Sequence, residues 1–166
     1  MSSPRVLLVN PAPPDAKKGN NVTTDRWQRI LEELGCTVAT ANEYSGDNYD
    51  ALIALHAHKS AQSIRRFSEN RPDAPLVVAL TGTDLYRDLE QSSRARESLD
   101  RADRLILLQP RGREALDEKH RAKTRVIHQS VSNVPDTPRR PESAEDQFVA
   151  LVVAHLRPIK DVLRVP

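Results

Sequence analysis

The chain has 166 residues, of which 38% are hydrophobic and 29% charged, and 25 basic residues nearly balance 23 acidic ones for a net charge of +2. This composition is typical of a globular protein with one core and argues against a nucleic-acid-binding protein, which usually has a concentrated basic face. Because the longest apolar runs fall far short of the roughly 20 residues of a membrane span, and neither a signal peptide nor a disulfide framework is visible, we expect a cytoplasmic protein that contacts neither membranes nor nucleic acid.

Short apolar runs alternate with amphipathic stretches, which is the pattern of a parallel sheet with crossover helices. The predicted strands span residues 5–10, 37–41, 50–56, 76–80, 104–109 and 124–129. We expect a first helix capped by Thr23 or Thr24, with Asp25 in its first turn, and further helices opening at Ser60, covering 95–102 and running from Pro110 to about residue 119. These elements fit one α/β domain with a doubly wound, Rossmann-like parallel sheet over residues 1–131.

The sequence changes character beyond this domain. Residues 132–146 contain three prolines and many charged side chains, which predicts an interdomain linker. Residues 148–154 form another apolar run, and such a strand needs neighbours on both sides. We therefore expect residues 147–166 to be the start of a truncated second domain, whose unpaired strand would favour self-association.

Several short strings in this pattern resemble a known enzyme family. They are NPAPP at 10–14, KGN at 18–20, ALHAHKS at 54–60, ALTGTDLYRD at 79–88, HQS at 128–130 and HLRPIKD at 155–161. In this order and spacing they are similar to the selenosugar synthases of selenoneine biosynthesis, which are glycosyltransferases of the GT-B architecture. The resemblance covers nearly the whole chain and about half of such an enzyme.

The resemblance implies an acceptor-side, amino-terminal domain of a two-domain transferase. The reaction would move a sugar from UDP-N-acetylglucosamine or UDP-glucose to selenophosphate, giving a 1-selenosugar with loss of UDP and phosphate. No cofactor and no metal would be required, and the donor nucleotide would be held mainly by the carboxyl-terminal domain. The 166-residue chain alone is then expected to be inactive.

Candidate site residues lie after the predicted strands, because parallel sheets bind ligands at the carboxyl ends of their strands. Lys17, Lys18, Gly19 and Asn20 lie between the first strand and a helix amino terminus, where backbone amides can meet an anion. A flexible loop with solvated lysines is the alternative.

Two histidines follow the third predicted strand. His56 and His58 are two residues apart, so we expect their side chains to share one face, with Lys59 beside them as a possible anion ligand. Both histidines are candidate catalytic residues, and hydrogen-bonded loop histidines are the alternative. No third partner for a metal is visible.

The loop after the fourth strand carries the next group. Thr81, Gly82 and Thr83 offer hydroxyls and exposed backbone to a substrate, and Arg87 can hold a phosphate in a bidentate contact. Asp84 is a candidate catalytic residue that orients a sugar hydroxyl or a basic group. Its alternative role is to cap the following helix.

Two further pairs complete the candidates. Gln129 and Ser130 follow the sixth strand and are expected to line the cleft. In related transferases an arginine and, five residues later, a lysine grip the donor diphosphate; His155 stands at the first of these positions, Lys160 matches the second, and Arg157 would compensate.

The chemistry of these residues leaves two roles open. Selenophosphate is an anionic, soft nucleophile that needs little base assistance, so the cleft would mainly supply positive charge. A hydroxyl acceptor would instead need a general base, and His56, His58 and Asp84 are the candidates. A non-enzymatic, flavodoxin-like binding module has the same alternation of elements, because fold does not fix function.

Overall fold

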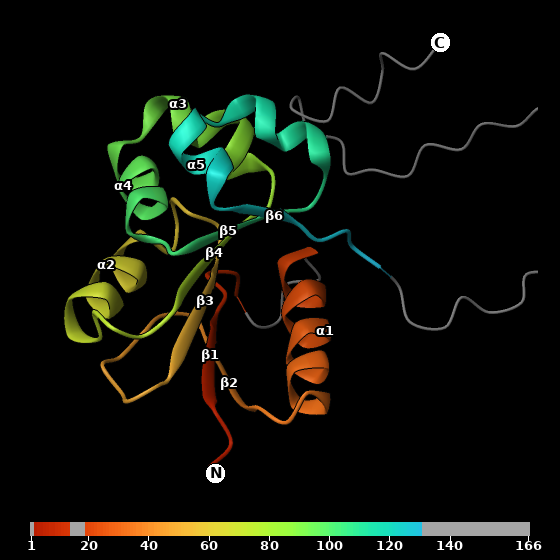
Figure 1. Ribbon diagram of the computed structural model, residues 1–166, viewed down its shortest axis with the longest axis vertical. Coiled ribbons are helices and arrows are strands. Elements are labelled where there is room, and N and C mark those ends of the chain that lie inside the picture. Colours follow the sequence, from red (N-terminus) through yellow and green to blue (C-terminus); the bar gives the residue numbers. More distant parts are fainter. Residues whose placement is uncertain (1, 14–18, 131–166) are drawn as a thin grey trace, which may run out of the picture. The chain divides into compact units, whose positions relative to one another are not determined.

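A computed structural model describes residues 2–13 and 19–130 (Figure 1). The expected linker at 132–146 and the expected second domain at 147–166 lie outside these residues. Within the described part of the chain, no helix combines the length and the apolar character that a bilayer crossing requires.

The fold is α/β with one six-stranded, all-parallel sheet, as the alternating pattern predicts. The strand order is β2-β1-β3-β4-β5-β6, and the strands are β1 Arg5–Val9, β2 Thr37–Ala41, β3 Ala51–Leu55, β4 Leu76–Leu80, β5 Arg104–Leu107 and β6 Thr124–Val126. The helical segments are α1 Gly19–Glu33, α2 Ala61–Asn70, the π-helical turn η1 Asp84–Asp88, α3 Leu89–Gln91, α4 Ser93–Arg101, the 3-10 helix η2 Pro110–Ala115 and α5 Glu118–Ala122. This order is the 2-1-3-4-5 order of doubly wound sheets with one added strand.

Helices cover both faces of the sheet, with α1 on one face and α2 and α4 on the other (Figure 1). The larger core lies under α2 and α4, where Phe67 and Leu99 are almost fully buried and Phe67 meets Tyr44 edge to face. The smaller core lies on the opposite face, where Trp27 of α1 packs against a cluster that includes Leu55. Burial on both faces explains why β3 and β4 are continuous apolar runs.

The first helix begins earlier than the sequence suggests. α1 starts at Gly19, and the hydroxyls of Thr23 and Thr24 donate to the carbonyls of Gly19 and Asn20 at 2.9 and 2.8 Å. The two threonines therefore lie inside the helix, and Asp25 is not in its first turn. The prediction of a threonine cap is wrong: each hydroxyl instead bonds the carbonyl four residues back, an alternative that threonine has inside a helix.

The region after β5 also departs from the prediction of one helix from 110 to about 119. It contains the short 3-10 helix η2 and then α5, whose N-cap Asp117 accepts a hydrogen bond from the His120 N–H at 3.1 Å. The break comes at Leu116, whose backbone is extended between η2 and the Asp117 cap. Within η2, a Cβ on Gly112 would lie 2.9 Å from Leu85 Cδ2 and 3.1 Å from Leu107 Cδ2. The backbone of η2 thus packs directly on the core.

Candidate functional site

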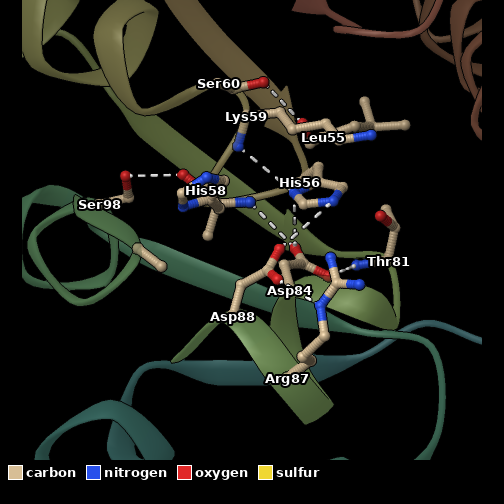
Figure 2. Close-up of polar contacts among 12 residues, drawn as sticks. Leu55, His56, His58, Lys59, Ser60, Thr81, Asp84, Arg87, Asp88 and Ser98 are labelled. Atoms are coloured by element: carbon tan, nitrogen blue, oxygen red, sulfur yellow. Dashed lines mark hydrogen bonds and ion pairs between the residues drawn. The ribbon is translucent and has the colours of Figure 1, made fainter. Parts of the chain in front are cut away.

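The candidate site lies at the carboxyl-terminal edge of the sheet. The chain moves from β1 to β2 in one direction and from β3 through β6 in the other, so the direction of winding switches between β1 and β3. Doubly wound sheets bind their ligands outside the strand ends at this point. The strand register brings the ends of β3 and β4 level, with Leu55 opposite Ala79, and the residues that follow both strands meet there (Figure 2).

His56 occupies an unusual backbone conformation immediately after β3. Its φ is 70°, in the left-handed region that non-glycine residues rarely adopt. Its N–H donates to the Ala79 carbonyl at 2.9 Å, and 5% of the residue is exposed. Because the strand has ended and the chain turns at His56, its side chain is buried whereas that of His58 is exposed. The prediction that the two histidines share one face is therefore wrong.

Asp84 is fully buried and joins the loops after β3 and β4. Its Oδ2 accepts the Ala57 N–H at 2.9 Å, and its Oδ1 accepts the Thr81 N–H at 3.0 Å. Burial raises the pKa of Asp84, while His56 and the Ala57 N–H act in the opposite direction. Asp84 is the first residue of η1 and not the cap of a following helix, so the capping alternative is wrong.

The imidazole of His56 faces the carboxylates of Asp84 and Asp88 (Figure 2). Nδ1 is 4.0 Å from Asp84 Oδ2, and Nε2 is 3.8 Å from Asp88 Oδ2. Nδ1 also accepts the Lys59 N–H at 3.4 Å. Burial lowers the pKa of His56, and the two carboxylates only partly oppose this shift. The ring is therefore neutral near pH 7.

Asp88 is a site residue that the sequence analysis does not identify. It is buried, and its Oδ1 accepts a hydrogen bond from Arg87 Nε at 2.9 Å. The Arg87 side chain is 60% exposed, so its guanidinium remains open to solvent at the sheet edge. The spacing of four residues from Asp84 is a signal in the sequence, because such residues share a side of a helical turn.

His58 is separate from the pair formed by His56 and Asp84. Its Nδ1 lies 2.7 Å from the Ser92 hydroxyl oxygen, which also caps α4 by accepting the Ala95 N–H at 3.2 Å. The rings of His56 and His58 thus have different partners. Lys59 is also exposed, next to the buried ring of His56.

The loop from Thr81 to Thr83 has a constrained backbone. Gly82 has a φ of 118°, which a side chain would strain. Thr83 precedes the π-helical turn, in which the Leu89 N–H bonds the Asp84 carbonyl. Such turns are rare and occur often at functional sites.

The remaining candidates lie nearer to α1. Gly19 and Asn20 are the first two residues of α1. Gln129 donates from Nε2 to the Thr23 hydroxyl at 3.0 Å, and Ser130 is exposed. Four predicted ligands, Lys17, Lys18, Arg157 and Lys160, lie outside the described residues.

The geometry defines what this edge can do chemically. It offers a neutral imidazole beside two carboxylates, and two exposed cationic side chains, Lys59 and Arg87, that can meet an anion. Among residues 2–13 and 19–130, no three histidine, cysteine or acidic side chains gather as metal ligands. Comparison of the sequence with protein-family models and with curated proteins gives no match.

Proposed function

We propose that this chain is the acceptor-side domain of a nucleotide-sugar-dependent glycosyltransferase of the selenosugar synthase type. The observation that carries the proposal is the convergence of His56, Lys59, Asp84 and Arg87 at the carboxyl-terminal edge beside the switch point. These residues come from two of the strings on which the family resemblance rests, and they lie where a doubly wound sheet binds ligands.

The proposed acceptor is selenophosphate. Its selenium would attack the anomeric carbon of the UDP-sugar, the bond from that carbon to the diphosphate oxygen would break, and UDP would leave. Water would then cleave the selenium–phosphorus bond to give the 1-selenosugar and phosphate. Lys59 and Arg87 would hold the anionic acceptor, since oriented positive charge offsets the repulsion between acceptor and donor. Asp84 and His56 would fix the loops that carry these side chains.

A second candidate function is transfer to a hydroxyl acceptor. The neutral imidazole of His56 beside Asp84 favours it, because an alcohol must lose a proton that a neutral imidazole can accept. In this case the alcohol proton would pass to His56 as the oxygen attacks the sugar. Only 5% of His56 is exposed, so its loop would have to open first.

Turnover separates these functions. Protein expressed with any coding sequence that follows Pro166 is incubated with UDP-N-acetylglucosamine or UDP-glucose and selenophosphate, and the product is identified by mass spectrometry. We expect a selenosugar, and about a tenfold or greater loss of kcat/KM on Lys59→Gln. The control is Arg71→Gln, because Arg71 lies at the opposite, amino-terminal edge between α2 and β4.

Three outcomes overturn the proposal in different ways. Products formed only from alcohols support the second function. Binding of other small molecules without binding or turnover of UDP-sugars supports the flavodoxin-like binding module. A selenosugar formed equally by the Lys59 and Arg71 variants removes the assigned anion site.

A further inference from the structure

A polar cavity lies at the same sheet edge as His56, on the other side of the switch point. It has a volume of about 240 Å3 and opens at the ends of β1 and β2. Its polar lining comes from two strand ends and the first turns of α1, namely Asn10, Asn21, Thr24, Asp25, Thr40 and Asn42. None of the His56, Asp84 or Asp88 side chains belongs to it.

The charge of this cavity differs from that of the His56 edge. Among the described residues that line the cavity, none is basic and only Asp25 is acidic. A phosphate group there would meet a carboxylate without a compensating cation among these residues. Amide and hydroxyl groups instead suit a neutral ligand that donates and accepts several hydrogen bonds.

Part of the lining is held rigidly by internal hydrogen bonds. Asn10 Nδ2 donates to Asn21 Oδ1 at 2.7 Å, and Asn10 Oδ1 accepts the Ala12 N–H at 3.1 Å. Asn42 Nδ2 donates to the carbonyls of Asn10 and Ala12 at 3.0 and 2.6 Å. These bonds fix the cavity wall before any ligand binds, which reduces the entropic cost of binding.

Other groups of the lining remain available to a ligand. Within the described part of the chain, no side chain or N–H bonds Asn42 Oδ1, the Thr40 hydroxyl or the Asp25 carboxylate. These oxygens are acceptors, and the hydroxyl can also donate. The cavity is smaller than the roughly 300–1,000 Å3 of sites for drug-sized ligands, so it fits one ring and not a whole nucleotide sugar.

We propose that this cavity binds the neutral, polyhydroxylated ring of a sugar. Asp25, Thr40 and Asn42 accept hydrogen bonds from its hydroxyls, and the Asn10–Asn21 pair forms the wall behind it. The inference rests on the proposed function in so far as a transferase brings a sugar to this edge. It adds a neutral subsite beside the anion-holding edge of Lys59 and Arg87.

The test is titration of the isotope-labelled 166-residue chain with free glucose, N-acetylglucosamine and uridine, followed by NMR. We expect saturable shifts at Thr40 and Asn42 with the hexoses or with the ribose of uridine. A parallel titration with inorganic phosphate should give no shifts at these residues. Comparison of the three ligands tells whether the cavity prefers a hexose ring or a ribose ring. Saturable binding of either kind of sugar ring supports the proposal.

Two conservative variants probe the contacts. Asp25→Asn and Thr40→Val keep the shape of each side chain but remove a charged acceptor or a hydroxyl, and we expect about a tenfold weaker affinity for the sugar from Asp25→Asn. The control is Asp73→Asn, which lies in the exposed turn between α2 and β4.

The outcomes of these titrations support or overturn the sugar site. No saturable shift at the cavity, shifts with phosphate alone, or equal affinities in all three variants overturns the sugar site. Because turnover is measured separately, selenosugar formation without sugar binding at Asn42 refutes this inference alone. Sugar binding without turnover refutes the proposed transferase alone.

Discussion

Replacement of Asp84 tests how one buried carboxylate holds the ends of β3 and β4. Its two oxygens accept the N–H groups of Ala57 and Thr81 at 2.9 and 3.0 Å, and the residue is fully buried. Asp84→Ala leaves both N–H groups without an acceptor. At about 1–3 kcal/mol for each buried unsatisfied donor, the free energy of unfolding should fall by about 2–6 kcal/mol, a large share of the roughly 5–15 kcal/mol of a typical domain.

Asp84→Asn provides a milder substitution with which the loss of unfolding free energy in Asp84→Ala can be compared. An amide offers one acceptor oxygen, so one N–H keeps its bond while the other faces the amide NH2. We expect a loss of about 1–3 kcal/mol. It should fall at the lower end, because the amide avoids the cost of burying a charge, which raises the pKa of Asp84 in the folded protein.

Urea unfolding followed by circular dichroism and by the fluorescence of Trp27, the single tryptophan, measures both values. Asp73→Asn is the matched control at an exposed position, where we expect a change within about 0.5 kcal/mol. If Asp84→Ala unfolds at the same urea concentration as the control, the carboxylate does not hold the two loops together.

Two further predictions concern pH and packing. The pKa of His56 in the folded protein is lowered from 6.5, so below that pH the unfolded state binds more protons than the folded state. The contribution of His56 to stability is therefore present above about pH 6.5 and is lost as the pH falls. The fall in unfolding free energy between about pH 7.5 and pH 5.5 should be smaller in His56→Gln, and an equal fall would contradict the assignment. Gly112→Ala should lower the melting temperature, at a cost of about 1–3 kcal/mol, because its Cβ would press on Leu85. Gly19→Ala, where no atom lies within 4 Å of a Cβ, should not be destabilised, and equal melting temperatures for the two variants would refute the packing argument.

Most of the strands were predictable because the central ones, such as β3 and β4, are short apolar runs with clear boundaries. The predicted bounds 37–41 and 76–80 coincide with β2 and β4. The run 124–129 ends earlier, since β6 covers only Thr124–Val126. Strand ends depend on pairing with a neighbour, and β6 lies at the edge of the sheet with β5 as its one partner strand.

The helices were less predictable where side chains have two uses. The Thr23–Thr24 pair has the composition of an N-cap, but both hydroxyls bond carbonyls inside α1. The helix expected after Pro110 ends at Leu116, and the preceding turn η2 packs Gly112 against the core with no room for a Cβ. That constraint comes from tertiary packing, which a local pattern does not contain.

The site was predictable in position and not in detail. The strings after β3 and β4 pointed to the carboxyl-terminal edge, and His56 and Asp84 do meet there. The spacing of Asp84 and Asp88 is visible in the sequence, but the left-handed turn at His56 and the π-helical form of the turn that carries the two carboxylates are not. The separation of His56 from His58 follows from that turn.

The most direct test of the account is whether the edge beside His56 holds an anionic acceptor. Calorimetric titration of the chain with thiophosphate, a stable analogue of selenophosphate, should show one saturable site. Lys59→Gln or Arg87→Gln should weaken the affinity for thiophosphate about tenfold or more, and Arg71→Gln at the opposite edge should leave it unchanged. Absence of binding, or equal affinities in all three variants, would contradict the account.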